Sequence, residues 1–213
     1  MKPIRSNRVI QILYPLFVYY IFYNVLYSVF SYIFQEKMGQ LFCLMLSGMI
    51  TIIPIYLIYR KVPKLIPDSI NKKSTYVLYA LGVICVVFIA ISLNVIITHL
   101  GIVENSDGFQ SASKKLTDGT LIIKILSNVM IIPILEELLY RGIIAGQVCL
   151  WYGWIAATIF SSFCFGISHF NIVQFLYALI VGIALGTLYC KTKRLSLCIL
   201  AHGITNLIVI LFS

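Results

Sequence analysis

The sequence predicts an all-α fold, a polytopic transmembrane bundle of about seven helices, with six to eight as the range. Of the 213 residues, 61% are hydrophobic and 11% are charged, and the mean hydropathy is +0.99. Soluble domains average about 45–50% apolar and about 25% charged residues. Several apolar runs reach the length of about 20 residues that a membrane helix needs. They lack the polar–apolar alternation of transmembrane β-strands.

Seven candidate spans follow one another along the chain. The first is much longer than the ~7–15-residue core of a signal peptide, so we expect a retained anchor. A basic, proline-containing loop at 60–74 separates the second span from the third, and the longest polar stretch, 103–120, separates the third from the fourth. We interpret 103–120 as a flexible external loop. The expected spans are 9–34, 39–59, 75–101, 121–147, 153–169, 173–190 and 195–212.

The net charge of +9 is distributed unevenly over the predicted loops. With the N-terminus inside, eleven basic residues fall on the cytoplasmic side: Lys2, Arg5, Arg8, Arg60, Lys61, Lys64, Lys72, Lys73, Lys191, Lys193 and Arg194. The other side receives Lys37, Lys114, Lys115 and Lys124. This asymmetry follows the positive-inside rule and predicts a multi-pass protein of the cell membrane with a cytoplasmic N-terminus. Membrane lipid is the partner that these charges predict, and nucleic acid is not.

The unusual polar residues divide the chain into two parts. We expect 1–120 to be N-terminal scaffold helices and 121–213 to hold the helices that carry the function. Gly182 and Gly186 form a small-xxx-small pattern that predicts close helix packing. The six cysteines lie in or beside apolar runs and form no CxxC pair, so we expect buried thiols rather than disulfides.

Two of the seven acidic residues, Glu136 and Glu137, lie inside a predicted span, in the stretch IIPILEELLYRG. An unpaired charge near the bilayer centre costs about 2.5–3.5 kcal/mol on insertion scales. Glu137 and Arg141 are four residues apart and can form an ion pair on one helical face. Glu136 then faces elsewhere and is available to act as a base. Pro133 predicts a kink or local opening of the helix here. A purely structural ion cluster is the alternative interpretation.

His169, His202 and Asn206 add polar groups to the later spans, and His202 and Asn206 share one helical face. A carboxylate and an imidazole can activate water, while a second imidazole and an amide can stabilise an oxyanion. Zinc bound by Glu136, His169 and His202 is the less favoured alternative to a cofactor-free site, because the HExxH pattern is absent. His99 has no polar neighbour in register, and we expect it to have a structural role.

The order of three motifs resembles the CAAX protease and bacteriocin-processing (CPBP) family, which includes the type II CAAX prenyl endopeptidases. The motifs are EELLYR with Glu136, Glu137 and Arg141, FGISH with Phe165 and His169, and HGITN with His202 and Asn206. The resemblance implies an intramembrane glutamate-type endopeptidase that needs no metal. It also implies that Glu136 and His169 activate water, that His202 and Asn206 form the oxyanion site, and that Glu137 and Arg141 are supporting residues.

The resemblance implies a substrate that is a membrane-associated peptide or protein precursor, such as a lipidated or leader-bearing one. Bacteriocin or pheromone maturation and self-immunity are the implied roles, and a composition rich in Ile, Tyr, Lys and Asn favours a bacterial source. A non-catalytic bacteriocin-immunity or interaction protein on the same fold is the main alternative. A proton- or solute-coupled transporter is a weaker one, because no inverted repeat is visible.

The predicted spans place the three functional residues at different depths. Counted from the inner span ends at 1.5 Å per residue, Glu136 lies ~16 Å deep, His169 ~24 Å and His202 ~10 Å. Helix tilt, a break at Pro133 or a misplaced span boundary must therefore bring them together.

Overall fold

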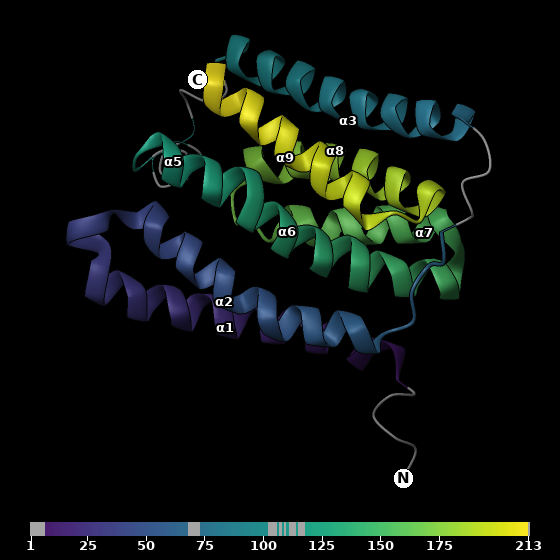
Figure 1. Cartoon of the computed structure of the whole chain (residues 1–213), viewed down its shortest axis with the longest axis horizontal. Coiled ribbons are helices and arrows are strands. Elements are labelled where there is room, and N and C mark those ends of the chain that lie inside the picture. Colours follow the sequence, from purple (N-terminus) through teal and green to yellow (C-terminus); the bar gives the residue numbers. More distant parts are fainter. Residues whose placement is uncertain are drawn as a thin grey trace.

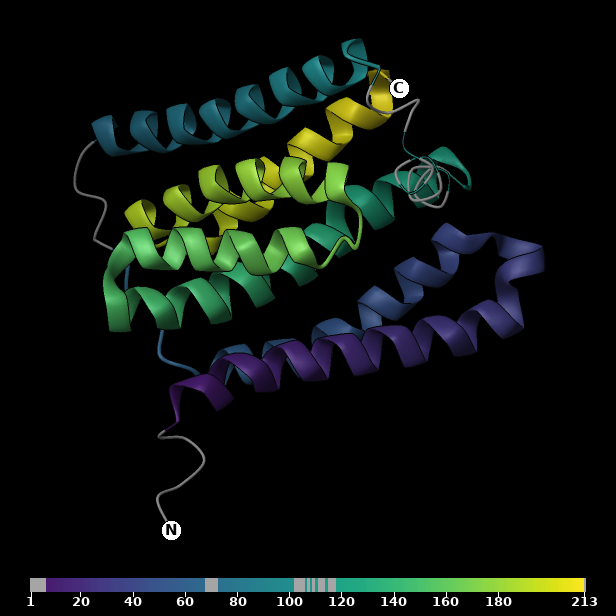
Figure 2. The same cartoon turned by 180° about the vertical axis from the view of Figure 1, so that it is seen from behind.

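The computed structural model describes residues 7–67, 73–101 and 118–212, with the single positions 106, 108, 110 and 114. Lys2, Arg5, Lys72 and most of the predicted 103–120 loop lie outside the described residues. The described segments form a helical bundle without strands, as predicted. Figures 1 and 2 show α3 along one side of the bundle and the α1–α2 hairpin along the other, with the later helices between them.

The helices of the first part follow the predicted spans closely. They are α1 (Arg8–Met38), α2 (Gln40–Lys61) and α3 (Lys73–His99). The Asn7 side chain caps α1 by accepting hydrogen bonds from the backbone amides of Val9 and Ile10. Gly39, with φ of 80°, makes the tight turn into α2. The Asp118 carboxylate accepts a hydrogen bond from the backbone N–H of Gln40 at 2.7 Å. The chain that enters the second part is therefore fixed to this turn.

The second part begins with a long helix of mixed hydrogen-bonding pattern. It comprises α5 (Leu121–Lys124), η2 (Ile125–Ile131), α6 (Ile132–Glu137), η3 (Leu138–Ala145) and the start of α7 (Gly146–Ile167), where η marks π-helical turns. Pro133 lies at the start of α6, and the helical backbone continues through it. The local opening expected at Pro133 therefore takes the form of π-helical turns on either side of α6, which are frequent at functional sites.

The turn between the fourth and fifth predicted spans lies at Gly153, whose φ of 85° and ψ of 172° interrupt α7. The predicted end of the fourth span at 147 was therefore too early, because helical residues continue to Tyr152. Glu136 lies 17 positions before this turn and His169 lies 16 positions after it, so the two residues fall at nearly the same depth. Beyond it follow α8 (Ile172–Thr192) and α9 (Leu195–Phe212).

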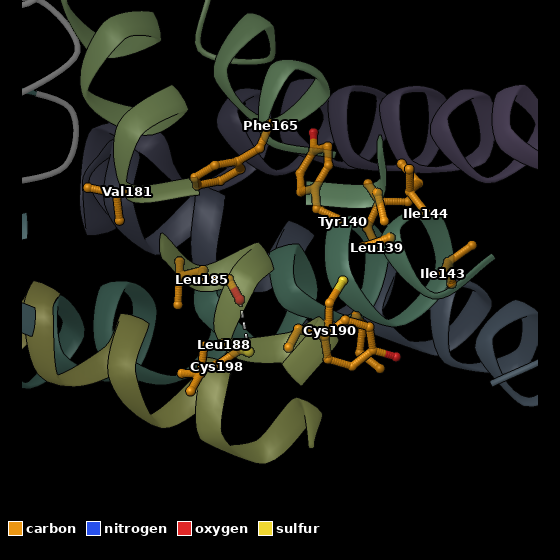
Figure 3. Packing of buried hydrophobic residues seen from close by; sticks show 14 of the residues in the cluster. Leu139, Tyr140, Ile143, Ile144, Phe165, Val181, Leu185, Leu188, Cys190 and Cys198 are labelled. Atoms are coloured by element: carbon orange, nitrogen blue, oxygen red, sulfur yellow. Dashed lines mark hydrogen bonds between the residues drawn. The ribbon is translucent and has the colours of Figure 1, made fainter. Parts of the chain in front are cut away.

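The second part of α7 packs tightly against α8. A methyl group on Gly182 would lie 3.0 Å from Ser162 Cβ, and one on Gly186 would lie 3.3 Å from Thr158 Cα. The packing role predicted for these two glycines is confirmed. Figure 3 shows the adjoining core, in which Tyr140 and Phe165 lie close together and Cys198 reaches the Leu185 carbonyl. The six cysteines are free thiols, as expected, but only Cys43, Cys190 and Cys198 are buried, and Cys85 is exposed.

Among the described residues, five helices are long and apolar enough to cross a membrane: α1, α2, α3, α8 and α9. At one end of the bundle, four basic side chains lie over aromatic rings. These pairs are Arg8 with Trp151 and Tyr152, Lys64 with Tyr59, Lys191 with Trp154, and Arg194 with Tyr79. Aromatic and basic side chains gathered at one level are typical of a membrane–water interface.

Candidate active site

Glu137 is the centre of a buried polar cluster between η3 and α9. Its side chain is fully buried, and its Oε1 accepts a hydrogen bond from Arg141 Nη1 at 2.8 Å. The predicted pairing of Glu137 with Arg141 is thus present. Arg141 is also fully buried and donates from Nη2 to the Gly182 carbonyl at 3.3 Å. The guanidinium therefore links the glutamate to α8, which the packing pattern at Gly182 did not suggest.

His202 joins α9 to both glutamates. Its Nδ1 lies 2.9 Å from Glu137 Oε1, and its Nε2 lies 3.8 Å from Glu136 Oε2. The carboxylate of Glu137 can only accept, so Nδ1 carries the proton in that contact. One oxygen of Glu137 therefore orients a guanidinium and an imidazole together, and the second nitrogen of the imidazole faces Glu136.

A close approach of α9 to η2 makes these contacts possible. A methyl group built on Gly203 would lie 2.6 Å from the Val129 carbonyl oxygen, so no larger residue fits without a shift of the backbone. One turn later, Asn206 donates from Nδ2 to the Asn128 carbonyl at 2.8 Å. An amide nitrogen has two hydrogens, so Asn206 can still donate to a ligand. His202 and Asn206 project from the same face of α9, as their spacing predicted.

His169 follows the C-terminal end of α7, where its ring is fixed by the preceding turn. Its Nδ1 lies 2.9 Å from the Phe165 carbonyl oxygen. Because a carbonyl only accepts, this contact places the proton on Nδ1 and leaves Nε2 as an acceptor in the neutral ring. Glu136 lies within electrostatic range of His169 as well as of His202. The structure thus brings Glu136, His169 and His202 into one neighbourhood.

Phe165 is the aromatic centre of this neighbourhood. Its ring centroid lies 5.1 Å from that of His169, 5.9 Å from that of His202 and 5.3 Å from that of Tyr140. Arg141 Cζ lies 4.6 Å from the same centroid. Phe165 is 3% exposed and belongs to the hydrophobic core, so both imidazoles pack edge to face against a buried aromatic ring. The FxxxH spacing had indicated Phe165 as a motif residue but not this position between both histidines.

Sequence reasoning missed an aromatic contribution from α1. The rings of Tyr19 and Tyr140 lie edge to face with centroids 6.5 Å apart, and Tyr19 stacks on Tyr23 at 5.6 Å. Tyr20 contacts Phe170 at 6.2 Å, directly beyond His169. Nothing in the spacing of these tyrosines distinguishes them from the many aromatic residues that face lipid. Among the other candidates, His99 is exposed at the end of α3.

Access to the cluster differs between the two glutamates. The Glu136 side chain is 14% exposed and that of His202 is 10% exposed, whereas Glu137 and Arg141 are 0% exposed. Glu136 and His202 can therefore contact a ligand. Glu137 and Arg141 are enclosed, and Glu137 fixes the orientation of His202. Within the part of the chain that the structure describes, no three His, Cys, Asp or Glu side chains are placed to hold one metal ion.

Comparison with known proteins follows the same division of the chain. Residues 118–208 match the family model described as "Type II CAAX prenyl endopeptidase Rce1-like". We call these residues, which are similar to that family, the Rce1-like segment. The predicted resemblance to the CAAX protease family is confirmed over this segment, which contains every predicted site residue. The Rce1-like segment begins at the Asp118 contact with the α1–α2 turn and ends within α9.

A curated relative agrees with this assignment. The chain is 35% identical over 79 residues to "Putative membrane peptidase YdiL" of Bacillus subtilis (strain 168). The alignment covers 37% of this chain, and the chain spans only 32% of the length of that relative. No solved structure matches the chain.

Proposed function

We propose that the protein is a membrane endopeptidase that hydrolyses a peptide bond of a membrane-associated peptide or protein precursor by a glutamate mechanism. The observation that carries this proposal is the distance of 3.8 Å between the partly exposed Glu136 and His202. The His202 ring is fixed by Glu137, which in turn is paired with Arg141. The Rce1-like match over 118–208 supports the same reaction class.

In this mechanism, Glu136 and His169 act on the attacking water. The Nε2 lone pair of His169 positions the water. Glu136 takes a proton from this water as the water oxygen bonds to the substrate carbonyl carbon. The tautomer set by the Phe165 carbonyl suits His169 to this acceptor role. When the C–N bond then breaks, the proton on Glu136 passes to the leaving amine, so Glu136 returns to its starting form.

His202 and Asn206 serve the oxyanion that forms on the carbonyl oxygen. His202 Nδ1 lies 2.9 Å from the Glu137 carboxylate and its Nε2 lies on the side of Glu136, so in the imidazolium form the ring donates from Nδ1 to Glu137 and has Nε2–H available for the oxyanion. His202 Nε2 is then a donor, and the second amide hydrogen of Asn206 is another. Both donors lie on one face of α9, so they can reach the same oxygen.

The substrate class follows from the location of the site. Glu136 lies in α6, which packs against α2 and α9, two of the helices that are long and apolar enough to cross a membrane. We infer that a precursor reaches it from the lipid or from the membrane surface. A lipidated or leader-bearing precursor fits this requirement, and maturation of a bacteriocin or pheromone is the role that we assign. We place the protein in the cell membrane with its N-terminus in the cytoplasm.

The test is cleavage of a candidate precursor in membranes that contain wild-type protein, Glu136→Gln or His202→Ala, with and without a chelator. The glutamate mechanism predicts that both variants lose cleavage and that chelation leaves the wild type active. Loss of cleavage on chelation alone would assign the site to zinc held by Glu136, His169 and His202. If Glu136→Gln keeps the cellular phenotype and no sample cleaves, the protein is a non-catalytic immunity or interaction protein.

A further inference from the structure

A long groove lies between α1 and α2, outside the site described above. Its volume is about 690 Å³. The walls are mostly apolar and include Ile10, Tyr14, Val18 and Phe22 from α1, and Leu57 and Ile58 from α2. From Ile10 to Phe22, twelve residues along α1, the groove extends ~18 Å at 1.5 Å per residue. A chain in extended conformation rises ~3.3 Å per residue, so the groove holds about five residues of it.

One of the residues that line the groove has a buried polar atom without a hydrogen-bond partner among the described residues. Gln147 lines the groove and is 1% exposed. Its Nε2 donates to the Ile143 carbonyl at 3.1 Å, and its Oε1 has no hydrogen-bond partner within the part of the chain that the structure describes. Because a carbonyl cannot donate, the contact with Ile143 fixes the orientation of the amide. A buried acceptor without a donor costs about 1–3 kcal/mol, so Gln147 indicates a ligand that supplies an N–H or O–H.

One end of the groove is basic and the other approaches the candidate active site. Lys61 lines the end near Ile10, where α2 finishes and α1 begins. At the opposite end, Val18 and Phe22 flank Tyr19, whose ring contacts Tyr140, four residues after Glu136. An elongated ligand can therefore extend from Lys61 towards the Tyr19–Tyr140 contact.

We propose that this groove binds an extended apolar segment of the peptide substrate, with a backbone N–H of the peptide on Gln147 Oε1 and an acidic group near Lys61. This inference rests on the proposed endopeptidase function. An acyl chain would fill the same apolar walls, but it has no hydrogen-bond donor for Gln147. The groove is separate from the hydrolytic residues, so it affects substrate binding and not the bond-breaking step.

The test uses photoactivatable ten-residue peptides of alanine and leucine with one glutamate, placed first or last, and a neutral version with glutamine. Each is added to the full chain in vesicles of phosphatidylethanolamine and phosphatidylglycerol, and labelled residues are found by mass spectrometry. Labelling of α1 and α2 groove residues is expected. Loss of one neutral hydrogen bond predicts about fivefold weaker labelling of Gln147→Leu, and thermal unfolding shows whether that variant folds. Lys61→Glu is expected to weaken labelling by the glutamate peptides, and Lys64→Glu, outside the groove, is not.

Two further variants test binding in the groove if Gln147→Leu does not fold. Val18→Trp fills the groove and is expected to abolish labelling, whereas Phe17→Trp, at a position 64% exposed on the neighbouring face, is not. The proposal would be overturned if Val18→Trp were labelled as strongly as the wild type. It would also be overturned if a photoactivatable phosphatidylglycerol labelled the groove in place of the peptide. Glu136→Gln should be labelled as the wild type is. If labelling persists while no precursor is ever cleaved, the endopeptidase function fails and the peptide groove remains.

Discussion

Glu137 and His202, 65 positions apart in the sequence, are joined by a 2.9 Å contact between Oε1 and Nδ1. The same oxygen accepts from Arg141 at 2.8 Å, so a single carboxylate fixes one cation on its own helix and one imidazole on α9. The arrangement divides the adjacent glutamates by environment. Glu137 is enclosed and fully engaged on Oε1, and Glu136 has the partial exposure that a reacting group needs.

Replacing Glu137 by glutamine should destabilise the fold, because it leaves the Arg141 guanidinium buried without its counter-charge. The expected loss is about 3–5 kcal/mol in the free energy of unfolding, measured by thermal or denaturant unfolding in detergent. Glu136→Gln is the matched control, since its side chain is partly exposed and should cost far less. Equal stability of the two variants would contradict the supporting role of Glu137. Combining Glu137→Gln with Arg141→Met should recover part of the loss.

A methyl group on Gly203 should separate α9 from η2. Overpacking of this kind costs about 1–3 kcal/mol, and the displacement would lengthen the His202–Glu137 and Asn206–Asn128 contacts together. Gly203→Ala is therefore expected to lose both stability and peptidase activity. Leu200→Ala, at a position 52% exposed on the same helix, serves as the control. Wild-type stability and activity of Gly203→Ala would show that α9 is not held by this approach.

His169→Ala should reduce kcat by about 100- to 10,000-fold if the imidazole helps to activate water. The fold should change little, since the side chain sits partly exposed in the turn after α7. The comparison is with Ser168→Ala, which removes the neighbouring hydroxyl but keeps the Phe165 carbonyl contact of His169. A variant that raises KM while kcat stays constant would assign His169 to substrate binding instead.

The orientation of the bundle can be tested with single cysteines in a cysteine-free background. Arg60→Cys is at the end that carries the cation–aromatic pairs, and Lys37→Cys is at the opposite end of α1. Both positions are exposed. In intact cells, a membrane-impermeant maleimide should label Lys37→Cys and spare Arg60→Cys until the membrane is opened. The reverse pattern would place the N-terminus outside.

The sequence was most informative where function required unusual residues. Acidic and imidazole groups stand out in an apolar chain, so Glu136, Glu137, His169 and His202 could be selected before their contacts were known. The Glu137–Arg141 pairing followed from helical spacing alone. The end of the fourth span was predicted at 147, although the apolar run continues through Val148 to Tyr152, because hydropathy does not mark the positive φ of Gly153 that makes the turn.

Contacts between distant helices were beyond the reach of local patterns. The contact of Tyr19 with Tyr140 joins positions 121 residues apart, and α1 contains many tyrosines at similar spacings. The Arg141 bond to the Gly182 carbonyl involves a backbone group, which no sequence motif marks. The groove between α1 and α2 depends on how far the two helices separate, a property of their packing angle rather than of either sequence.

The Tyr19–Tyr140 contact also determines how far the chain can be shortened from its N-terminus. The Rce1-like segment alone begins at residue 118, so a truncated chain that starts there would have lost α1 and with it the aromatic cover of Tyr140. Tyr140 is fully buried in the intact chain, and without α1 its ring would be exposed to lipid or to a second copy of the fragment. Transplanting the recognisable segment into another protein would therefore require a helix that replaces α1.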